Sequence, residues 1–144
     1  VALCALEKAK AAQCGNLKIL IANAKNLTDY FQKGDVKVLY LNFSDPWPKK
    51  GHTKRRLTYR GFLELYKQIL TDDGKICFKT DNAGLFEFSL DEFKEAGFCL
   101  SEVTDDLHNS IYNEGNIETE YERNFSAKGF SIHRLVASMP SKCE

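Results

Sequence analysis

The chain has 144 residues, 43% of them hydrophobic, and its twenty basic and twenty acidic side chains cancel. This length and composition are typical of one globular domain, so residues 1–144 are expected to form a single domain. No stretch approaches the apolar length that spans a bilayer and the start is not signal-like, which argues against a membrane partner and favours a cytoplasmic location.

The first part of the chain is expected to alternate helices and strands. Residues 1–15 have a helical pattern that ends at Gly15, as helices often do. Leu17 to Ile21 form an apolar run typical of a buried strand, and residues 26–31 are expected to form a short helix. Residues 36–43, rich in branched and aromatic side chains, predict a second strand.

The same unit of strand, loop and helix is then repeated. Thr58 is the expected N-cap of a helix that runs through Leu70, with the sequence TDDG as its exit. The later elements expected are a strand at 75–79, a helix at 83–96, a strand at 98–103, a short helix at 118–125 and a strand at 130–137.

This alternation predicts an α/β fold with a mainly parallel sheet, in which the last two strands form an antiparallel pair at one edge. Ligands of such sheets bind beyond the carboxyl ends of the strands. Two polar segments, 42–50 and 79–82, follow such ends. Their coincidence predicts a functional site there.

The loop after the second strand has the sequence DPWP. Asp45 lies between Phe43 and two prolines, which restrict the backbone and make the loop stiff. A carboxylate there can accept hydrogen bonds from a base edge, while Trp47 offers a face for stacking. The same residues equally fit a structural role, with Trp47 packed in the core and Asp45 capping the turn.

Positive charge is concentrated just beyond this loop. Residues 42–60 hold six basic side chains against Asp45 alone, a local charge of +5, which leaves −5 for the rest of the chain. Lys54, Arg55 and Arg56 precede a helix N-terminus, where the helix dipole disfavours positive charge. A solvated turn is the alternative, but phosphates of a nucleic acid or of a phosphorylated ligand would offset this charge.

The remaining candidate features are weaker. The segment TEYE, residues 119–122, fits an exposed helix start with Thr119 as the capping residue. The five cysteines form no CxxC pair and the three histidines have no ligand-like spacing, so we expect reduced thiols, no disulfide framework and no metal site.

Taken together, the blocks NFSDPWPKKGHTKRR, KTDN and TEYE closely resemble the bacterial tRNA (guanine-N7-)-methyltransferases. The likeness extends from about Val1 to Val136. It implies a Rossmann-like class I methyltransferase fold that uses S-adenosyl-L-methionine to methylate N7 of guanosine 46 in the variable loop of tRNA. The partner it implies is tRNA, and the chain is expected to be a monomer or a homodimer.

The resemblance also implies roles for residues at matching positions. Asp45 is the implied catalytic residue at the meeting point of methyl donor and guanine, and Asn23 is implied to lie near the cofactor with it. The implied substrate contacts are Lys49, Asp81, Thr119, Glu120, Tyr121 and Glu122. The implied RNA-contacting segment comprises Gly51, His52, Thr53, Lys54, Arg55 and Arg56.

These roles agree with the chemistry of the reaction. Guanine N7 carries a lone pair and no proton, so no general base is required. What remains is to align N7 with the methyl group and to stabilise the positive charge that develops on the ring. Asp45 and Asp81 are suited to this as orienting and electrostatic groups.

The family's first two strands and its glycine-rich cofactor loop would precede Val1. We therefore expect the chain to be the C-terminal two-thirds of a longer enzyme. The alternative function is a tRNA-binding or scaffold protein that takes no cofactor. A weaker option is methylation of another base or of a protein side chain.

Overall fold

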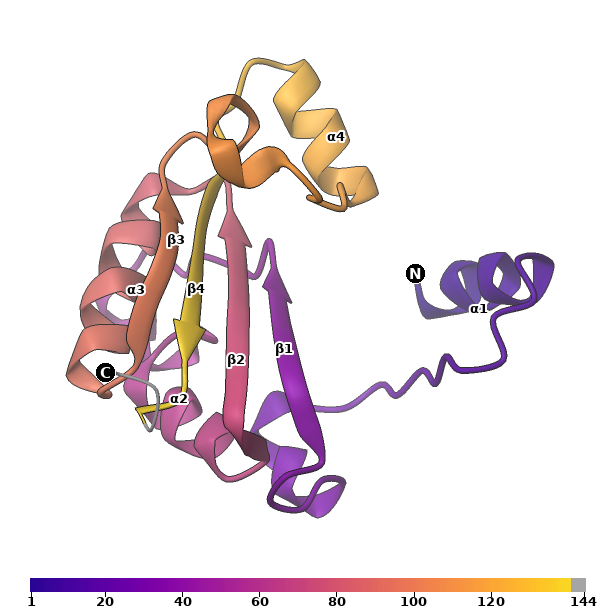
Figure 1. Cartoon of the computed structure of the whole chain (residues 1–144), viewed down its shortest axis with the longest axis horizontal. Coiled ribbons are helices and arrows are strands. Elements are labelled where there is room, and N and C mark those ends of the chain that lie inside the picture. Colours follow the sequence, from indigo (N-terminus) through magenta and orange to yellow (C-terminus); the bar gives the residue numbers. More distant parts are fainter. Residues whose placement is uncertain (141–144) are drawn as a thin grey trace.

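The computed structural model describes residues 1–140, and its centre is a four-stranded sheet (Figure 1). In spatial order the strands are β1 (Val36–Asn42), β2 (Leu70–Thr80), β4 (His133–Ser138) and β3 (Cys99–Thr104). β1 and β2 pair in parallel, and β4 is antiparallel to both β2 and β3. The α/β fold with an antiparallel pair at one edge is confirmed, but the sheet formed by residues 1–140 is mixed and not mainly parallel, since two of its three strand pairings are antiparallel. The C-terminal strand, however, is the inner member of that pair, because it forms ladders on both of its sides.

The helices connect and flank these strands. The α-helices are α1 (Ala2–Ala11), α2 (Arg60–Lys67), α3 (Ala83–Glu95) and α4 (Glu120–Ala127). The short 3-10 helices are η1 (Ala24–Asp29), η2 (Lys50–Arg55), η3 (Leu107–Asn109) and η4 (Ile111–Asn113). None of the helices within residues 1–140 is long and apolar enough to cross a membrane.

The hydrophobic core lies between the sheet and the helices α2 and α3. Because side chains alternate along a strand, Ile76 and Phe78 of β2 point to one face, where their neighbours are Leu41 of β1 and Leu135 of β4. Phe62, Leu63 and Tyr66 of α2 and Leu85, Phe86 and Phe93 of α3 complete the core on that face. The opposite face carries polar side chains, among them Lys75 and Lys79.

The N-terminus of α2 differs from the prediction. Its N-cap is Tyr59, whose side chain makes no cap hydrogen bond, and the hydroxyl of buried Thr58 lies 2.7 Å from that of Ser89 instead. The carboxylate of Glu92 on α3 accepts from the backbone N–H of Arg60 at 2.5 Å and from its guanidinium at 2.8 Å. A side chain from a neighbouring helix therefore caps α2, which no local pattern could have indicated.

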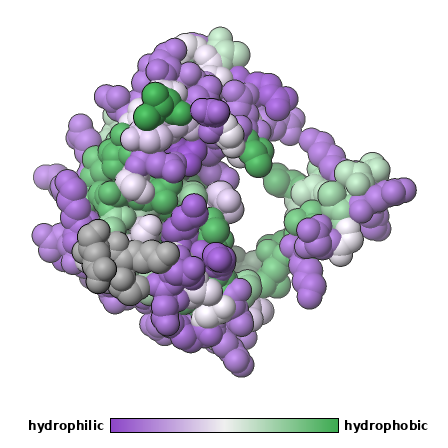
Figure 2. Space-filling view, in the orientation of Figure 1, coloured by the Kyte–Doolittle hydropathy of each residue, from purple (hydrophilic) through white to green (hydrophobic). Residues whose placement is uncertain are grey.

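The predicted strand from Leu17 to Ile21 is wrong. The segment has no regular structure, and these two residues are 52% and 85% exposed. Within residues 1–140 no strand lies beside it, and an extended apolar run needs a neighbour to satisfy its backbone. Figure 2 shows an open space between this N-terminal part and the body of the molecule. The segment TDDG is likewise no helix exit, since it lies within β2.

The cysteines depart from expectation in one respect. Cys4 and Cys14 are exposed free thiols and Cys77 is a partly buried one. Cys99 is disulfide-bonded, whereas the scattered spacing of the cysteines predicted reduced thiols throughout. Spacing in the sequence could not reveal which cysteines the fold brings together.

Candidate active site

The carboxyl ends of β1 and β2 bring the two polar segments together, as predicted. Asn42 pairs with Lys79 in the ladder, and the N–H of Phe43 donates to the carbonyl of Lys79 at 2.9 Å. The DPWP loop and the segment that contains Asp81 therefore leave the sheet side by side. Helix α4 lies at the same end of the sheet (Figure 1).

The DPWP loop is held in a strained conformation. Phe43 and Trp47 have φ angles of 54° and 41°, in the left-handed region that bulky side chains rarely adopt. Such strain persists only where the surroundings impose it, and it is concentrated at functional sites. Asp45 lies between these two residues, is exposed, and has no hydrogen bond to any of the residues described. Its carboxylate is therefore free to contact a ligand.

Asn23 and Asp45 line one cavity of about 570 Å³, together with Phe43, Ser44 and Trp47. The volume lies in the range of about 300–1000 Å³ found for small-molecule sites. The side-chain oxygen of Asn23 caps η1 by accepting from the N–H of Lys25 at 3.0 Å. The side-chain N–H groups of Asn23 have no hydrogen-bond partner among the described residues. The Ser44 hydroxyl is buried without a partner in residues 1–140. These polar groups suit a polar ligand such as a nucleoside.

Basic residues of η2 cover the DPWP loop. The guanidinium of Arg55 lies 5.0 Å from the centroid of the Trp47 ring, and the His52 ring meets that ring edge-on at 5.6 Å. Lys49, Lys50 and Lys54 are exposed and have no described ion pair. The predicted RNA-contacting segment therefore presents positive charge beside Asp45.

Arg56 differs from its neighbours. Its Nε donates to the carbonyl of Pro46 at 2.9 Å and its Nη2 to the carbonyl of Trp47 at 3.1 Å. The guanidinium also lies 4.4 Å from the centroid of the Phe88 ring. These contacts use the Nε and Nη2 donors of Arg56 to hold the DPWP loop, so the residue supports that loop, and its predicted contact with RNA stays a prediction.

Asp81 and Tyr121 form a wall beside the loop. The Tyr121 hydroxyl lies 3.4 Å from the nearer Asp81 oxygen, and its ring packs 4.2 Å from Phe125 and 4.7 Å from Phe43, centroid to centroid. Burial first, and then the nearby Asp81 carboxylate, raises the pKa of Tyr121 above its ordinary value of about 10. Since Phe43 also lines the cavity, the wall adjoins the space that Asp45 faces.

Glu122 is placed differently from the prediction. Its side chain is fully buried and both carboxylate oxygens are bonded, Oε2 to Lys79 at 2.5 Å and Oε1 to His108 at 2.8 Å and Asn116 at 2.9 Å. Burial alone would raise the pKa of Glu122, but these hydrogen bonds outweigh it and hold the pKa below its ordinary value. A carboxylate with no free face is not available to a substrate.

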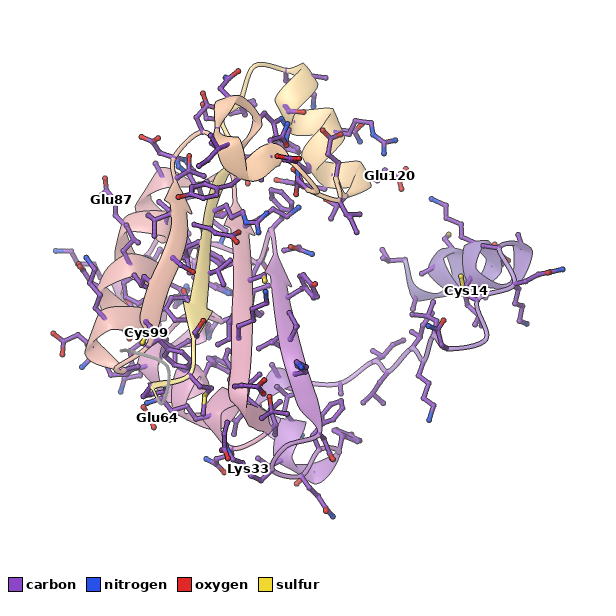
Figure 3. The ribbon with its side chains drawn as sticks, in the orientation of Figure 1. Cys14, Lys33, Glu64, Glu87, Cys99 and Glu120 are labelled. Carbon is purple, nitrogen blue, oxygen red and sulfur yellow. The ribbon has the colours of Figure 1, made fainter. Side chains whose placement is uncertain are left out.

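Of the other residues in the TEYE segment, Thr119 has a structural role and Glu120 is exposed on the surface. Thr119 and Glu122 form a capping box at the start of α4, the structural alternative that the sequence allowed for Thr119. Glu120 is exposed and lies 3.1 Å from Lys8 of α1, on the side of α4 that faces that helix (Figure 3). Of the four predicted contacts in this segment, Tyr121 has the placement that best suits a substrate.

His133 gives the site end of the sheet a dependence on pH. Burial lowers its pKa, its Nδ1 is buried without a described partner, and its ring stacks on Phe86 at 5.1 Å. The unfolded chain therefore binds a proton more readily than the folded one, and the free energy of unfolding falls as pH decreases through and below about 6.5. We expect urea unfolding to show a shallower decrease from pH 7.5 to 5.5 in His133→Phe, which keeps the stacking. An unchanged slope would refute this.

Comparison with known proteins identifies the family of the chain. A family model described as "Putative methyltransferase" matches residues 1–135. The chain belongs to this methyltransferase family. It is similar to the tRNA (guanine-N(7)-)-methyltransferases of Geobacillus sp. (strain WCH70), with 54% identity over 142 residues, and of Listeria monocytogenes serotype 4b (strain F2365), with 56% over 137. These matches cover 99% and 95% of the chain but 64% of each relative. The chain thus spans a little under two-thirds of the length of the relatives it matches.

A solved structure has a similar fold. Geranyl diphosphate C-methyltransferase from Streptomyces coelicolor A3(2) matches with a TM-score of 0.54 and 12% identity, over 95% of this chain and 59% of that one. At this identity the likeness concerns the fold alone. The predicted class I methyltransferase fold is confirmed.

The residues that hold the site in place could not be recognised from the sequence. Lys79, His108 and Asn116 surround Glu122. Lys79 belongs to the predicted polar segment 79–82, but the role of these three side chains in holding Glu122 was not predicted. One signal was present for Lys79, a cation at the end of the otherwise apolar run ICF in a strand. A charged side chain there must be paired or solvated, but its partner was not identifiable from the sequence.

Proposed function

We propose that the protein transfers a methyl group from S-adenosyl-L-methionine to N7 of guanosine 46 in the variable loop of tRNA, in the cytoplasm. The observation that carries this proposal is the placement of Asp45 on a strained loop, between a cavity shared with Asn23 and a wall formed by Asp81 and Tyr121. The names of the similar relatives support the same substrate.

The donor set of the cavity fits the proposed cofactor in part. The amide of Asn23 can hydrogen-bond an adenine edge, and the buried Ser44 hydroxyl needs a polar partner. S-adenosyl-L-methionine, when bound, supplies an electrophilic methyl group on a positively charged sulfur. The carboxylate of Asp45 adds negative charge where the guanine ring becomes cationic.

The remaining side chains act on the guanosine and its RNA. Asp81 can accept from the N1–H and N2–H edge of guanine, and Tyr121 supports it from α4. Lys49 is exposed at the start of η2, where it can approach the substrate phosphate. Because N7 has no proton to lose, orientation and electrostatic stabilisation account for the chemistry.

The direct test is incubation of the chain with unmodified tRNA and methyl-labelled donor, followed by nucleoside analysis. We expect label only in 7-methylguanosine, and none with a tRNA that carries adenosine at position 46. Label in another nucleoside, or no label, would refute the proposed reaction.

A tRNA-binding protein that uses no cofactor is the second candidate. The exposed cations Lys49, Lys50 and Lys54 have no described ion pair and could bind RNA whatever occupies the cavity. Calorimetry with S-adenosyl-L-methionine separates the two candidates. Saturable heat supports the enzyme, and tRNA binding without such heat supports the binding protein.

The two neighbouring arginines at the end of η2, Arg55 and its C-cap residue Arg56, are expected to act differently. Arg55→Ala should weaken tRNA binding and reduce the slope of log K against log salt by about 1, because a phosphate contact is lost. Arg56→Ala should change that slope little and lower kcat instead, because the DPWP loop loses its hydrogen bonds. Filter binding over a salt series, with single-turnover kinetics, checks both. Identical behaviour of the two variants would contradict the division.

A further inference from the structure

A buried ion pair joins the two segments that carry Asp81 and Tyr121. Lys79 Nζ lies 2.5 Å from Glu122 Oε2, and the two side chains are 9% and 0% exposed. Lys79 precedes Asp81 by two residues at the end of β2, and Glu122 follows Tyr121 on α4. The ion pair therefore fixes the distance between the backbone of the sheet and the backbone of the helix just where those other two side chains meet.

Both charged groups have their hydrogen-bonding capacity filled. Lys79 Nζ also donates to Asn116 Oδ1 at 3.1 Å and to the carbonyl of Ile117 at 3.0 Å, which accounts for its three protons. Glu122 Oε1 accepts from Asn116 and is bonded to His108. Neither group can contact a ligand without losing these bonds, so any effect on a reaction must pass through their neighbours.

Helix α4 depends on this network for its position. Glu122 is the one buried residue of the helix, whose Tyr121 is 40% exposed. A buried ion pair is a weak source of net stability, because the cost of removing two charges from water offsets their attraction. What such a pair can supply is a defined geometry.

We propose that Lys79 and Glu122 are positioning residues that hold the Tyr121 hydroxyl against Asp81, and that this contact fixes the wall on which the guanosine is oriented. The part that concerns guanosine rests on the proposed function. The part that concerns the Tyr121–Asp81 contact does not.

The contact can be tested without any substrate, by NMR titration of tyrosines labelled with carbon-13. Tyr121→Phe assigns the resonance. In Lys79→Met we expect the pKa of Tyr121 to fall towards its ordinary value of about 10, since the ring loses burial and its neighbour Asp81. Removal of a nearby cation would by itself raise the pKa of Tyr121, so a fall in this pKa would show that the contact between Tyr121 and Asp81 has been lost.

The matched control is Lys75→Met. Lys75 lies on the same face of β2, is exposed and has no described ion pair, so Tyr121 should titrate as in the wild type. Glu122→Gln, which keeps the shape of the side chain, serves where Lys79→Met does not fold. A folded variant of either kind in which Tyr121 titrates as in the wild type overturns the proposal.

Kinetics then test the effect on the reaction. We expect Lys79→Met to lower kcat roughly 10- to 100-fold, with a change of about twofold or less in the dissociation constant of tRNA, because misplacement of an orienting group impairs alignment. The losses in Lys79→Met and Tyr121→Phe should combine to less than their product, since both act through one contact. Fully multiplicative losses, or weaker tRNA binding with unchanged kcat, would refute this part. Absence of methyl transfer in the wild type would refute the proposed function and leave the titration result standing.

Discussion

Replacing Asp45 by alanine is expected to lower kcat/KM for tRNA methylation roughly 100- to 1000-fold, the loss typical when one preorganised electrostatic group is removed from an active site. Asp45 is exposed and bonded to none of the described residues, so the substitution should leave the fold intact. Initial rates with labelled donor, together with a circular dichroism spectrum, measure both effects.

Two further variants make this result specific. Asp45→Asn keeps the shape and one hydrogen-bond acceptor but removes the charge, so an intermediate loss would indicate that charge contributes alongside orientation. Asp91→Ala removes an exposed carboxylate of α3 that has no described hydrogen bond, and should have wild-type activity. Undiminished methyl transfer by Asp45→Ala would eliminate the role given to this residue.

The second large effect concerns stability. Glu92→Ala is expected to lower the free energy of unfolding by about 2–3 kcal/mol, because it removes a buried, charged acceptor and leaves the first N–H of α2 without a partner. Urea unfolding followed by circular dichroism measures the difference.

The neighbouring positions provide the control. Glu87→Ala changes an exposed carboxylate on the same helix with no described hydrogen bond, and should shift the free energy of unfolding by less than about 0.5 kcal/mol. Glu92→Gln keeps an acceptor for the Arg60 N–H and should fall between the two. Equal stabilities of Glu92→Ala and Glu87→Ala would contradict the capping role.

Local patterns predicted the fold where each element carries its own signal. The branched and aromatic composition of residues 36–43 was enough to predict β1, and the expected strand at 75–79 coincides with the C-terminal half of β2. Leu17 to Ile21 has an equally apolar pattern but is no strand, since strand formation needs a neighbour as well as a composition. The predicted N-cap of α2 was wrong for a related reason, because the acceptor that caps this helix is Glu92, more than thirty residues further along the chain.

The same distinction holds for the site. That Asp45 and Asp81 would leave adjacent strand ends could be predicted, since carboxyl ends of parallel strands meet at one edge. Which charged groups turn inward could not. Arg56 and Glu122 belong to charged motifs that predict contact with a ligand, yet both are bonded within the chain. Their partners are backbone carbonyls and residues from distant segments, which motif spacing does not reveal.

The capping box of α4 has a consequence for how this helix folds. Glu122 Oε2 is 3.4 Å from the N–H of Thr119, which it caps, and 2.5 Å from the ammonium group of Lys79, which docks the helix on β2. A helix of eight residues is not stable alone in water. Because one carboxylate both starts the helix and attaches it, α4 should form and open together with its attachment to the sheet, as a single cooperative unit in hydrogen exchange. The wall formed by Asp81 and Tyr121 would then be either fully assembled or absent, with few molecules in partly assembled states.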